Sequence, residues 1–231
     1  MREIDSPAAF AEAFSVSRET LERLKTYEAL LQQWQKTINL VAPGTLETVW
    51  HRHFADSAQL LALAPPEPKT WLDLGSGAGF PGLVVAILLA GSDRDPETPA
   101  GPAVAKGRAA KTRVTLVESD SRKAAFLRET ARKVAVPVDI VAGRIEAAAT
   151  RANLRHSDVI SARALAPLPR LIGLAMPFVG PKTMCLFPKG REAGRELQTA
   201  ELQWNFTSEL VPSLTEPEAR IAVLKGCKPK L

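Results

Sequence analysis

A glycine-rich turn between two apolar runs is the segment of this 231-residue chain best suited to hold a ligand. The run that ends on Asp73 predicts a buried strand, and the run Leu83 to Leu89 predicts a helix. Four glycines lie between them, at Gly75, Gly77, Gly79 and Gly82. A strand, a glycine turn and a helix in this order let the backbone approach a ligand closely and direct helix N–H groups toward it. The sequence therefore predicts a ligand site in this turn.

The glycine spacing leaves two ligands open. Residues Gly77 to Gly82 satisfy Gly-x-Gly-x-x-Gly, which favours a dinucleotide such as NAD. However, Gly75 comes earlier, inside an Asp-Leu-Gly-Ser-Gly segment that begins at Asp73, and the next strand ends on Glu118. This pattern resembles the S-adenosylmethionine turn of Rossmann-like methyltransferases. In such a turn, the acidic residue that ends the second strand accepts hydrogen bonds from both ribose hydroxyls.

The remaining chain predicts an α/β fold that carries the turn. Strands and helices alternate from Lys69 onward, which predicts a mostly parallel Rossmann-like sheet with helices on both faces. Two final strands without a helix between them predict a C-terminal antiparallel hairpin at the sheet edge. We expect an N-terminal helical region over residues 1–68, with helices at 17–39 and 46–63, and a methyltransferase domain over residues 69–231. The predicted strands are 70–74, 113–118, 136–142, 158–161, 183–187, 205–211 and 220–224, and the helices of this domain are 82–90, 121–134, 144–150, 168–176 and 191–203.

Residues 91–111 interrupt this alternation. They are rich in Gly, Pro, Ala and charge and show no periodicity, although a few residues normally suffice between a helix and the next strand. We predict a flexible surface insertion. Its basic half, with Lys106, Arg108 and Lys111, is either a contact for RNA or a solvated loop without a binding role.

Composition narrows the class of protein further. The chain is 45% hydrophobic, and its net charge of +5 permits an anionic partner such as RNA without requiring one. Two cysteines predict free thiols, and the three histidines show no zinc spacing, so no metal is expected. The acidic N-terminus does not resemble a signal peptide, and the longest apolar run, Leu83 to Ala90, is too short to span a membrane. We therefore expect a cytoplasmic protein that does not enter a membrane.

Further motifs follow one another along most of the chain. They are Trp34 with Ile38-Asn39-Leu40, Arg52-His53-x-x-Asp56-Ser57, the turn from Asp73 to Gly82, Leu116-Val117-Glu118-Ser119, Lys123 with Phe126-Leu127, Gly143-Arg144-Ile145-Glu146, Ser161-Ala162-Arg163-Ala164, and Lys189-Gly190. With these motifs the chain is similar to the RsmG (GidB) family of bacterial small-subunit rRNA guanine-N7 methyltransferases. The Gly-Phe-Pro-Gly end of the turn and the Arg-His-x-x-Asp-Ser motif are the parts most specific to that family. The 91–111 insertion and the part beyond Gly190 depart from its pattern.

The resemblance implies a cofactor and a substrate. The cofactor is S-adenosyl-L-methionine, and the partner is 16S rRNA or a small ribosomal subunit particle, with the protein expected as a monomer. It also implies that Gly75 and Phe80 contact the cofactor, that Ile145 and Glu146 flank its adenine, and that Arg163 lies at the mouth of the site. Together with the residues of the turn and of the second strand, the predicted cofactor-binding set is Asp73, Gly75, Gly77, Phe80, Glu118, Ile145, Glu146 and Arg163.

Transfer to guanine N7 makes few demands on acid–base chemistry. N7 carries an exposed lone pair and no proton, so no general base is required and positioning can supply the catalysis. Arg163 is predicted to position the RNA, by contact with a phosphate or with guanine O6. The alternative is a structural arginine paired with a carboxylate such as Asp73 or Glu118.

Three side chains are candidates for contact with RNA. Arg52 and His53 belong to the second predicted helix, and Lys189 follows the fifth strand, where it is either a phosphate ligand or a surface lysine without a role. His53 and Asp56 share a helix face, where a mutual hydrogen bond is possible. The alternative role for His53 is therefore in a structural network that locks the helix to the sheet. Three other functions stay open: an NAD-dependent oxidoreductase, a noncatalytic RNA-binding module, and a methyltransferase with a different acceptor.

Overall fold

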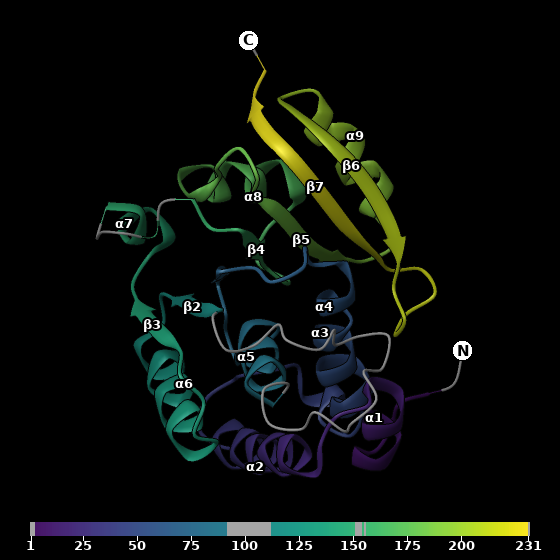
Figure 1. Ribbon diagram of the computed structural model, residues 1–231, viewed down its shortest axis with the longest axis vertical. Coiled ribbons are helices and arrows are strands. Elements are labelled where there is room, and N and C mark those ends of the chain that lie inside the picture. The colour runs from purple at the N-terminus through teal and green to yellow at the C-terminus, as the bar shows by residue number, and fades with distance from the viewer. Residues whose placement is uncertain (1–2, 92–111, 151–153, 155, 231) are drawn as a thin grey trace.

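Seven strands form one mixed sheet in the computed structural model, which describes residues 3–91, 112–150, 154 and 156–230. The strand order is β3-β2-β1-β4-β5-β7-β6 (Figure 1). The first five strands pair in parallel, whereas β7 is antiparallel to both β5 and β6. The strands are β1 Thr70–Leu74, β2 Arg113–Glu118, β3 Asp139–Ala142, β4 Val159–Ser161, β5 Met184–Lys189, β6 Trp204–Pro212 and β7 Arg220–Pro229. The predicted parallel sheet with a C-terminal antiparallel hairpin is confirmed.

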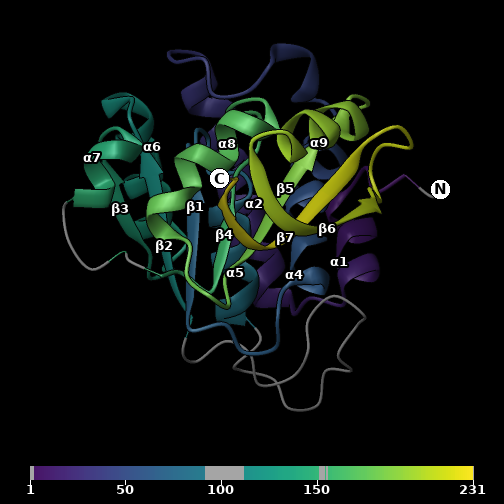
Figure 2. The ribbon, with the colours of Figure 1, turned by 90° about the horizontal axis from the view of Figure 1, so that it is seen from above.

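Two apolar clusters lie on opposite faces of this sheet, because successive strand residues point to opposite sides. The α-helices that cover them are α1 Pro7–Phe14, α2 Arg18–Gln35, α3 Asp56–Ala58, α4 Leu60–Leu63, α5 Gly82–Gly91, α6 Ser121–Lys133, α7 Ile145–Thr150, α8 Leu168–Ala175 and α9 Ala193–Glu201. Trp71 belongs to the cluster under α1, α2, α5 and α6, and its neighbour Leu72 belongs to the cluster under α7, α8 and α9. Figure 2 shows α8 and α9 on one side of the strands and α1, α4 and α5 on the other.

The first long helix, α2, is shorter than its apolar pattern predicts. Ser17 caps its start by accepting a hydrogen bond from Thr20 N–H at 3.2 Å. Its end is set by Gln35, whose Oε1 accepts from the N–H groups of Leu40 and Val41 at 2.9 and 3.0 Å. This side chain satisfies the backbone of the following loop, so the chain leaves the helix four residues before the predicted end at residue 39.

The second predicted helix, over 46–63, is broken into short pieces. A 3₁₀ turn, Pro43–Thr45, precedes a π-helical segment, Trp50–Ala55, which continues into α3 and α4. Most residues from Trp50 to Leu61 are buried, so packing on nearly every side competes with the regular helical hydrogen bonds. Helix α1 was not predicted, although Ser6 caps it and Pro7 begins it, which is a recognisable start signal.

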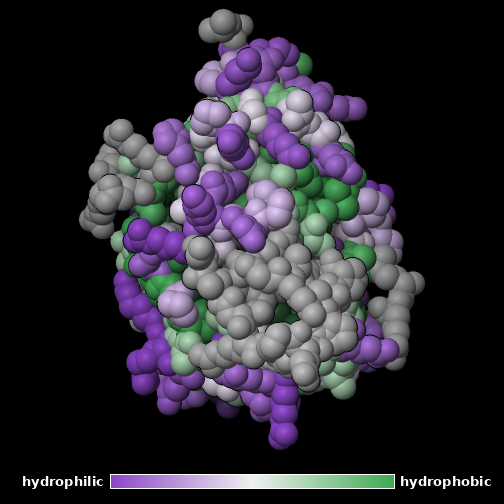
Figure 3. Space-filling model, in the orientation of Figure 1, coloured by the Kyte–Doolittle hydropathy of each residue, from purple (hydrophilic) through white to green (hydrophobic). Residues whose placement is uncertain are grey.

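The predicted insertion at 91–111 lies outside the described residues, apart from Gly91 at the end of α5. None of the described helices is long and apolar enough to cross a membrane. Cys185 and Cys227 are buried free thiols, as predicted. Hydrophilic side chains cover the top and the lower rim of the face drawn in Figure 3, with hydrophobic residues showing between them.

Candidate functional site

The glycine turn is held against the end of β2 by its own backbone. Ser76 N–H donates to Val117 O at 3.0 Å, and Gly77 N–H donates to Glu118 Oε2 at 2.7 Å. Gly77 has a φ of +56°, and a Cβ built there meets only Gly75 O, at 3.9 Å. The turn therefore presents bare backbone to open space, where a ligand can approach it closely.

A cavity of about 330 Å³ lies along this turn, and we name it the turn cavity. Glu118 stands in its wall, 7% exposed, with Oε1 accepting a second backbone hydrogen bond from Asp120 N–H at 2.7 Å. Each carboxylate oxygen thus keeps one acceptor position for a ligand. The residues that line the cavity include Gly75, Gly77, Phe80, Glu118, Lys123 and Arg163. Five of the predicted cofactor-binding residues are therefore gathered around one cavity.

Asp73 lies beneath the turn and not in the wall of the turn cavity. Its side chain is 0% exposed, and Oδ1 accepts a hydrogen bond from Ser161 Oγ at 2.7 Å, from the residue that faces it on β4. Burial raises the pKa of Asp73 to about 6, against the opposing effect of the Ser161 hydrogen bond. This position does not support the predicted direct contact of Asp73 with a cofactor. The carboxylate instead ties the start of the turn to the neighbouring strand.

Ile145 and Glu146 lie at the start of α7, just after β3. Ile145 is 8% exposed and belongs to the apolar cluster that also contains Leu74 and Val117, whereas Glu146 is exposed. Among the described residues, neither of the two lines the turn cavity. Their place beside the adenine therefore stays a prediction.

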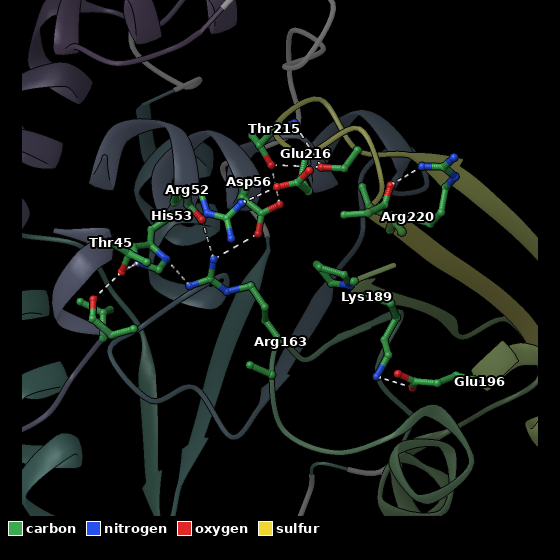
Figure 4. Close-up of a pocket in the computed structure, with 18 of the residues that line it drawn as sticks. Thr45, Arg52, His53, Asp56, Arg163, Lys189, Glu196, Thr215, Glu216 and Arg220 are labelled. Carbon is green, nitrogen blue, oxygen red and sulfur yellow. Dashed lines mark hydrogen bonds and ion pairs between the residues drawn. The ribbon is translucent and has the colours of Figure 1, made fainter. Parts of the chain in front are cut away.

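Arg163 connects the turn cavity to the helical N-terminal part (Figure 4). Its Nη1 donates to Arg52 O at 2.9 Å and to Asp56 Oδ2 at 3.1 Å, and its Nη2 donates to His53 Nδ1 at 2.7 Å. The guanidinium also lies 5.2 Å from the centroid of the Phe80 ring. One side chain thus fixes the distance between the end of β4, the turn and the π-helical segment.

The partner of Arg163 differs from both carboxylates that the sequence suggested. Asp73 accepts from a strand hydroxyl and Glu118 from two backbone N–H groups, whereas the ion pair of Arg163 forms with Asp56 at 3.1 Å. The mutual hydrogen bond predicted between His53 and Asp56 is likewise wrong, because both side chains bind the guanidinium of Arg163. The expectation of a network that locks this helical segment to the sheet is nevertheless met.

His53 is held as a neutral imidazole inside this network. Burial, together with the positive charges of Arg163 and Arg52, lowers its pKa to about 3. Because Nδ1 accepts from Arg163, Nε2 carries the proton and donates to Thr45 Oγ1 at 2.8 Å. The Thr45 hydroxyl donates in turn to Ala42 O at 2.7 Å. This chain of hydrogen bonds fixes the loop that borders the turn cavity.

Phe80, the aromatic residue of the turn, is enclosed by two flat side chains. The Tyr27 ring stacks on it at a centroid distance of 5.3 Å, and the His53 ring stacks at 4.9 Å. The Tyr27 hydroxyl donates to Ala78 O inside the turn. Helix α2 therefore supports the turn directly, which gives the N-terminal helices a role in shaping the site.

A second cavity, of about 510 Å³, adjoins the turn cavity, and we name it the hairpin cavity. Four residues line both cavities, so the two share a wall: Leu40, Val41, Arg163 and Ala164. Arg52 and Glu216 stand in the wall and form an exposed ion pair at 2.9 Å. The predicted RNA contacts Arg52, His53 and Lys189 thus share one cavity (Figure 4).

Lys189 reaches toward α9 along the wall of this cavity. Its Nζ donates to Ala166 O at 2.9 Å and pairs with Glu196 Oε2 at 2.6 Å. Glu196 Oε2 also accepts from Leu168 N–H at 2.6 Å, at the start of α8. The lysine therefore carries a fixed partner, and its charge is partly compensated.

Sequence reasoning assigned no site role to many residues of these walls, and three of them are polar or close to the turn. Lys123 and Leu165 line the turn cavity, and Glu196 lines the hairpin cavity. Lys123 could have been found from the sequence, because it lies in the first turn of the helix that follows the acidic strand end at Glu118. No sequence pattern indicated Glu196, because its position in the cavity wall depends on how α9 packs against α8. No group of three or more metal-ligating side chains occurs in the described part of the chain.

The strand order and the glycine turn together define the Rossmann-like methyltransferase fold. Two solved structures share it: an O-methyltransferase from Bacillus cereus in complex with SAH, with a TM-score of 0.56, 13% identity, and coverage of 87% of this chain and 90% of that one; and cofactor-bound Rv0187 from MTB, with a TM-score of 0.57, 12% identity, and coverage of 97% and 98%. At these identities the likeness concerns the fold alone.

Sequence comparison gives the family. The family model described as GidB, rRNA small subunit methyltransferase G, matches residues 20–93 and 104–222. Proteins named Ribosomal RNA small subunit methyltransferase G are 47% identical in Parvibaculum lavamentivorans, over 96% of this chain and 90% of the relative, and 48% identical in Rhodospirillum centenum, over 96% and 91%. The chain belongs to the rRNA small subunit methyltransferase G (GidB) family.

Proposed function

We propose that this protein transfers a methyl group from S-adenosylmethionine to N7 of a guanine in 16S rRNA. The observation that carries the proposal is the identity of 47–48% to proteins named Ribosomal RNA small subunit methyltransferase G, over nearly the whole chain. The gathering of the turn glycines, Phe80 and Glu118 around one cavity supports the same reaction from the geometry.

The turn cavity fits this cofactor by its donors and its shape. Gly77 leaves open the space that a Cβ would fill, and Glu118 is held in place by two backbone N–H groups. We assign Glu118 to the two ribose hydroxyls, Gly75 and Gly77 to close backbone contact, and Phe80 to the wall. Asp73 positions the turn from below. When bound, S-adenosylmethionine supplies a methyl group carried on a positively charged sulfonium.

Methylation of guanine N7 requires the protein to position the reactants and does not require it to transfer a proton. Guanine N7 loses no proton on methylation, so no residue has to act as a general base. His53 also fits this view, because a neutral imidazole whose two nitrogens are both engaged has no free position for proton transfer. Arg163, rigidly held by three partners, is the positioning residue between the two cavities. Arg52, His53 and Lys189 are proposed to shape the RNA entrance.

The same proposal includes the RNA partner, the oligomeric state, the location and the domain roles of the protein. The partner is 16S rRNA, free or in a small ribosomal subunit particle, and the protein acts as a monomer in the cytoplasm, where this RNA occurs. Residues 69–231 form the catalytic domain. The helical region 1–68 packs into the apolar cluster of that domain and supports the turn through Tyr27.

The decisive experiment measures 7-methylguanosine in 16S rRNA by nuclease digestion and mass spectrometry. Cells that lack the gene should lose one modified guanosine, and purified protein with S-adenosylmethionine should restore it on rRNA or on subunits from those cells. Tight binding of NAD without affinity for S-adenosylmethionine would favour the oxidoreductase. Cofactor binding without methyl transfer to rRNA would favour a noncatalytic RNA-binding module or another acceptor.

A further inference from the structure

The hairpin cavity offers paired charges and not bare cations. Each of its three acidic side chains lies opposite a basic one, and the pairs are Arg52–Glu216, Arg163–Asp56 and Lys189–Glu196. Its fourth basic residue, Arg220, donates to the main-chain oxygens of Pro217 and Ala219. A phosphate would have to compete with these carboxylates. A neutral, flat group with both donors and acceptors matches such walls better, and a nucleobase has this chemistry.

The position of the cavity points to the base that reacts. A volume of about 510 Å³ admits one base with its sugar, and Arg163 and Ala164 belong to the wall shared with the turn cavity, together with Leu40 and Val41. Enzymes that modify a base take it out of the stack and hold it in a pocket beside the reactive group. The hairpin cavity is placed for that role, given the proposed function.

Glu196 is the carboxylate in these walls that is both fixed and available. Both of its contacts, with Leu168 N–H and with Lys189, fall on Oε2, and no hydrogen bond engages Oε1 in the described part of the chain. Its side chain is 24% exposed, so it is held in place yet open to the cavity. Asp56 has both oxygens engaged, whereas the Glu216 side chain is 42% exposed and pairs with an exposed arginine, Arg52, its one ionic partner among the described residues.

We propose that the hairpin cavity binds the target guanine and that Glu196 selects it. Guanine carries N7 and O6 acceptors on one edge and the N1–H and N2–H₂ donors on another. With N7 toward Arg163 and the turn cavity, the donor edge faces the opposite wall, where Figure 4 shows Glu196 beside Lys189. Oε1 accepts from the 2-amino group on this edge. Adenine offers no donor at the corresponding positions, so the carboxylate rejects it. This assignment rests on the proposed function.

A competition between two purines tests the role of Glu196. 16S rRNA is transcribed with GTP and a small fraction of ITP, because inosine keeps N7 but lacks the 2-amino group. The RNA, free or assembled with small-subunit proteins, is methylated, digested and analysed for 7-methylguanosine and 7-methylinosine. The natural protein should prefer guanosine by about 10-fold over the input ratio, the factor expected for one charged hydrogen bond. Glu196→Gln should bring that ratio close to the input.

The matched control is Glu192→Gln, which removes the same charge just before α9, outside the cavity walls, and should keep the preference of the natural protein. Equal selectivity in Glu196→Gln and the natural protein would overturn the assignment. Absence of preference in the natural protein overturns it without any variant, which covers a Glu196→Gln protein that does not fold. Failure to form either methylated purine refutes the proposed function and the assignment with it, whereas 7-methylguanosine without selectivity refutes the assignment alone.

Discussion

Glu118 shows how one carboxylate can serve the fold and a ligand together. Its two oxygens accept backbone hydrogen bonds from Gly77 and Asp120, which pin the glycine turn to the end of β2. Each oxygen still has an acceptor position toward the turn cavity. The strand end is therefore preorganised, and little side-chain entropy remains to be lost when a ribose binds.

Glu118→Ala should weaken cofactor binding by about 1–3 kcal/mol, roughly 5- to 150-fold in Kd, because charged hydrogen bonds are lost. Calorimetric titration with S-adenosylhomocysteine measures this directly. Glu209→Ala, an exposed change on β6, is the control and should bind like the natural protein. An unchanged Kd for the Glu118 variant would place the ribose elsewhere.

Asp73 and His53 should act on stability in opposite directions as pH changes. The pKa of Asp73 is raised from 3.8 to about 6, so between these values the folded state binds more protons and Asp73 lowers stability as pH rises. The pKa of His53 is lowered from 6.5 to about 3, so the unfolded state binds more protons and His53 raises stability as pH rises. The two effects oppose each other between about pH 4 and 6.

Removal of either ionisable group should reveal the effect of the other on the pH dependence of the unfolding free energy. Urea unfolding of Asp73→Asn between pH 4 and 6 should give an unfolding free energy that rises more steeply with pH than in the natural protein. His53→Gln should give a shallower or falling curve. Each group contributes at most about 1.4 kcal/mol per pH unit to the slope. Parallel curves for all three proteins would show that neither carries the assigned proton affinity.

At the scale of elements, the start of α5 is packed so closely that it requires glycine. A Cβ at Gly82 would lie 2.6 Å from Asp73 Cβ and even closer to a methyl group of Leu116. Both neighbours belong to central strands and have no free direction to move. The glycine therefore decides how closely α5 approaches the sheet, and with it the position of the turn.

Gly82→Ala should destabilise the protein by about 1–3 kcal/mol, as overpacking of a core does. Thermal or urea unfolding measures the loss. Gly194→Ala in α9 is the matched control, because nothing lies within 4 Å of a Cβ at that position and alanine favours a helix. The control should be neutral or more stable. Equal stability of both variants would contradict the packing argument.

At the scale of the whole molecule, the hairpin loop after β6 is tied to the segment before β1. Leu214 N–H donates to Gln59 Oε1 at 2.8 Å, and Gln59 Nε2 donates to Ser213 Oγ at 3.2 Å. His51 Nε2 donates to Thr215 O at 2.8 Å. Two parts of the chain more than 150 residues apart thus close the hairpin cavity.

Gln59→Leu should lower the unfolding free energy by about 1–2 kcal/mol, because the hydrogen bonds of the buried Gln59 side chain with Leu214 N–H and Ser213 Oγ are lost. Hydrogen exchange at Leu214 should quicken more than at central strands such as β1. Gln33→Leu, an exposed change on α2, is the control and should stay within about 0.5 kcal/mol of the natural protein. Unchanged exchange at Leu214 would show that other contacts hold the loop.

Local signals in the sequence determined the sheet, the turn and most element boundaries. Strand residues 70–74 and 113–118 match β1 and β2 as predicted, because central parallel strands are short apolar runs bounded by turn residues. The glycine turn and Glu118 follow from the same local order. The breaks in the helix predicted over 46–63 were not predicted, because burial on most sides overrides the apolar pattern that periodicity detects.

Only the tertiary structure decided which side chains meet. Arg163 pairs with Asp56, 107 residues away, and Glu196 binds Leu168 N–H, 28 residues away. A charged residue has many possible partners of opposite sign in a sequence, and the packing of helices on the sheet selects one. For the same reason the motifs supplied single residues of the hairpin cavity but did not predict the cavity itself, since its walls come from the N-terminal loop, the strand ends, α9 and the hairpin loop. Periodicity describes neighbours along the chain, whereas a cavity depends on neighbours in space.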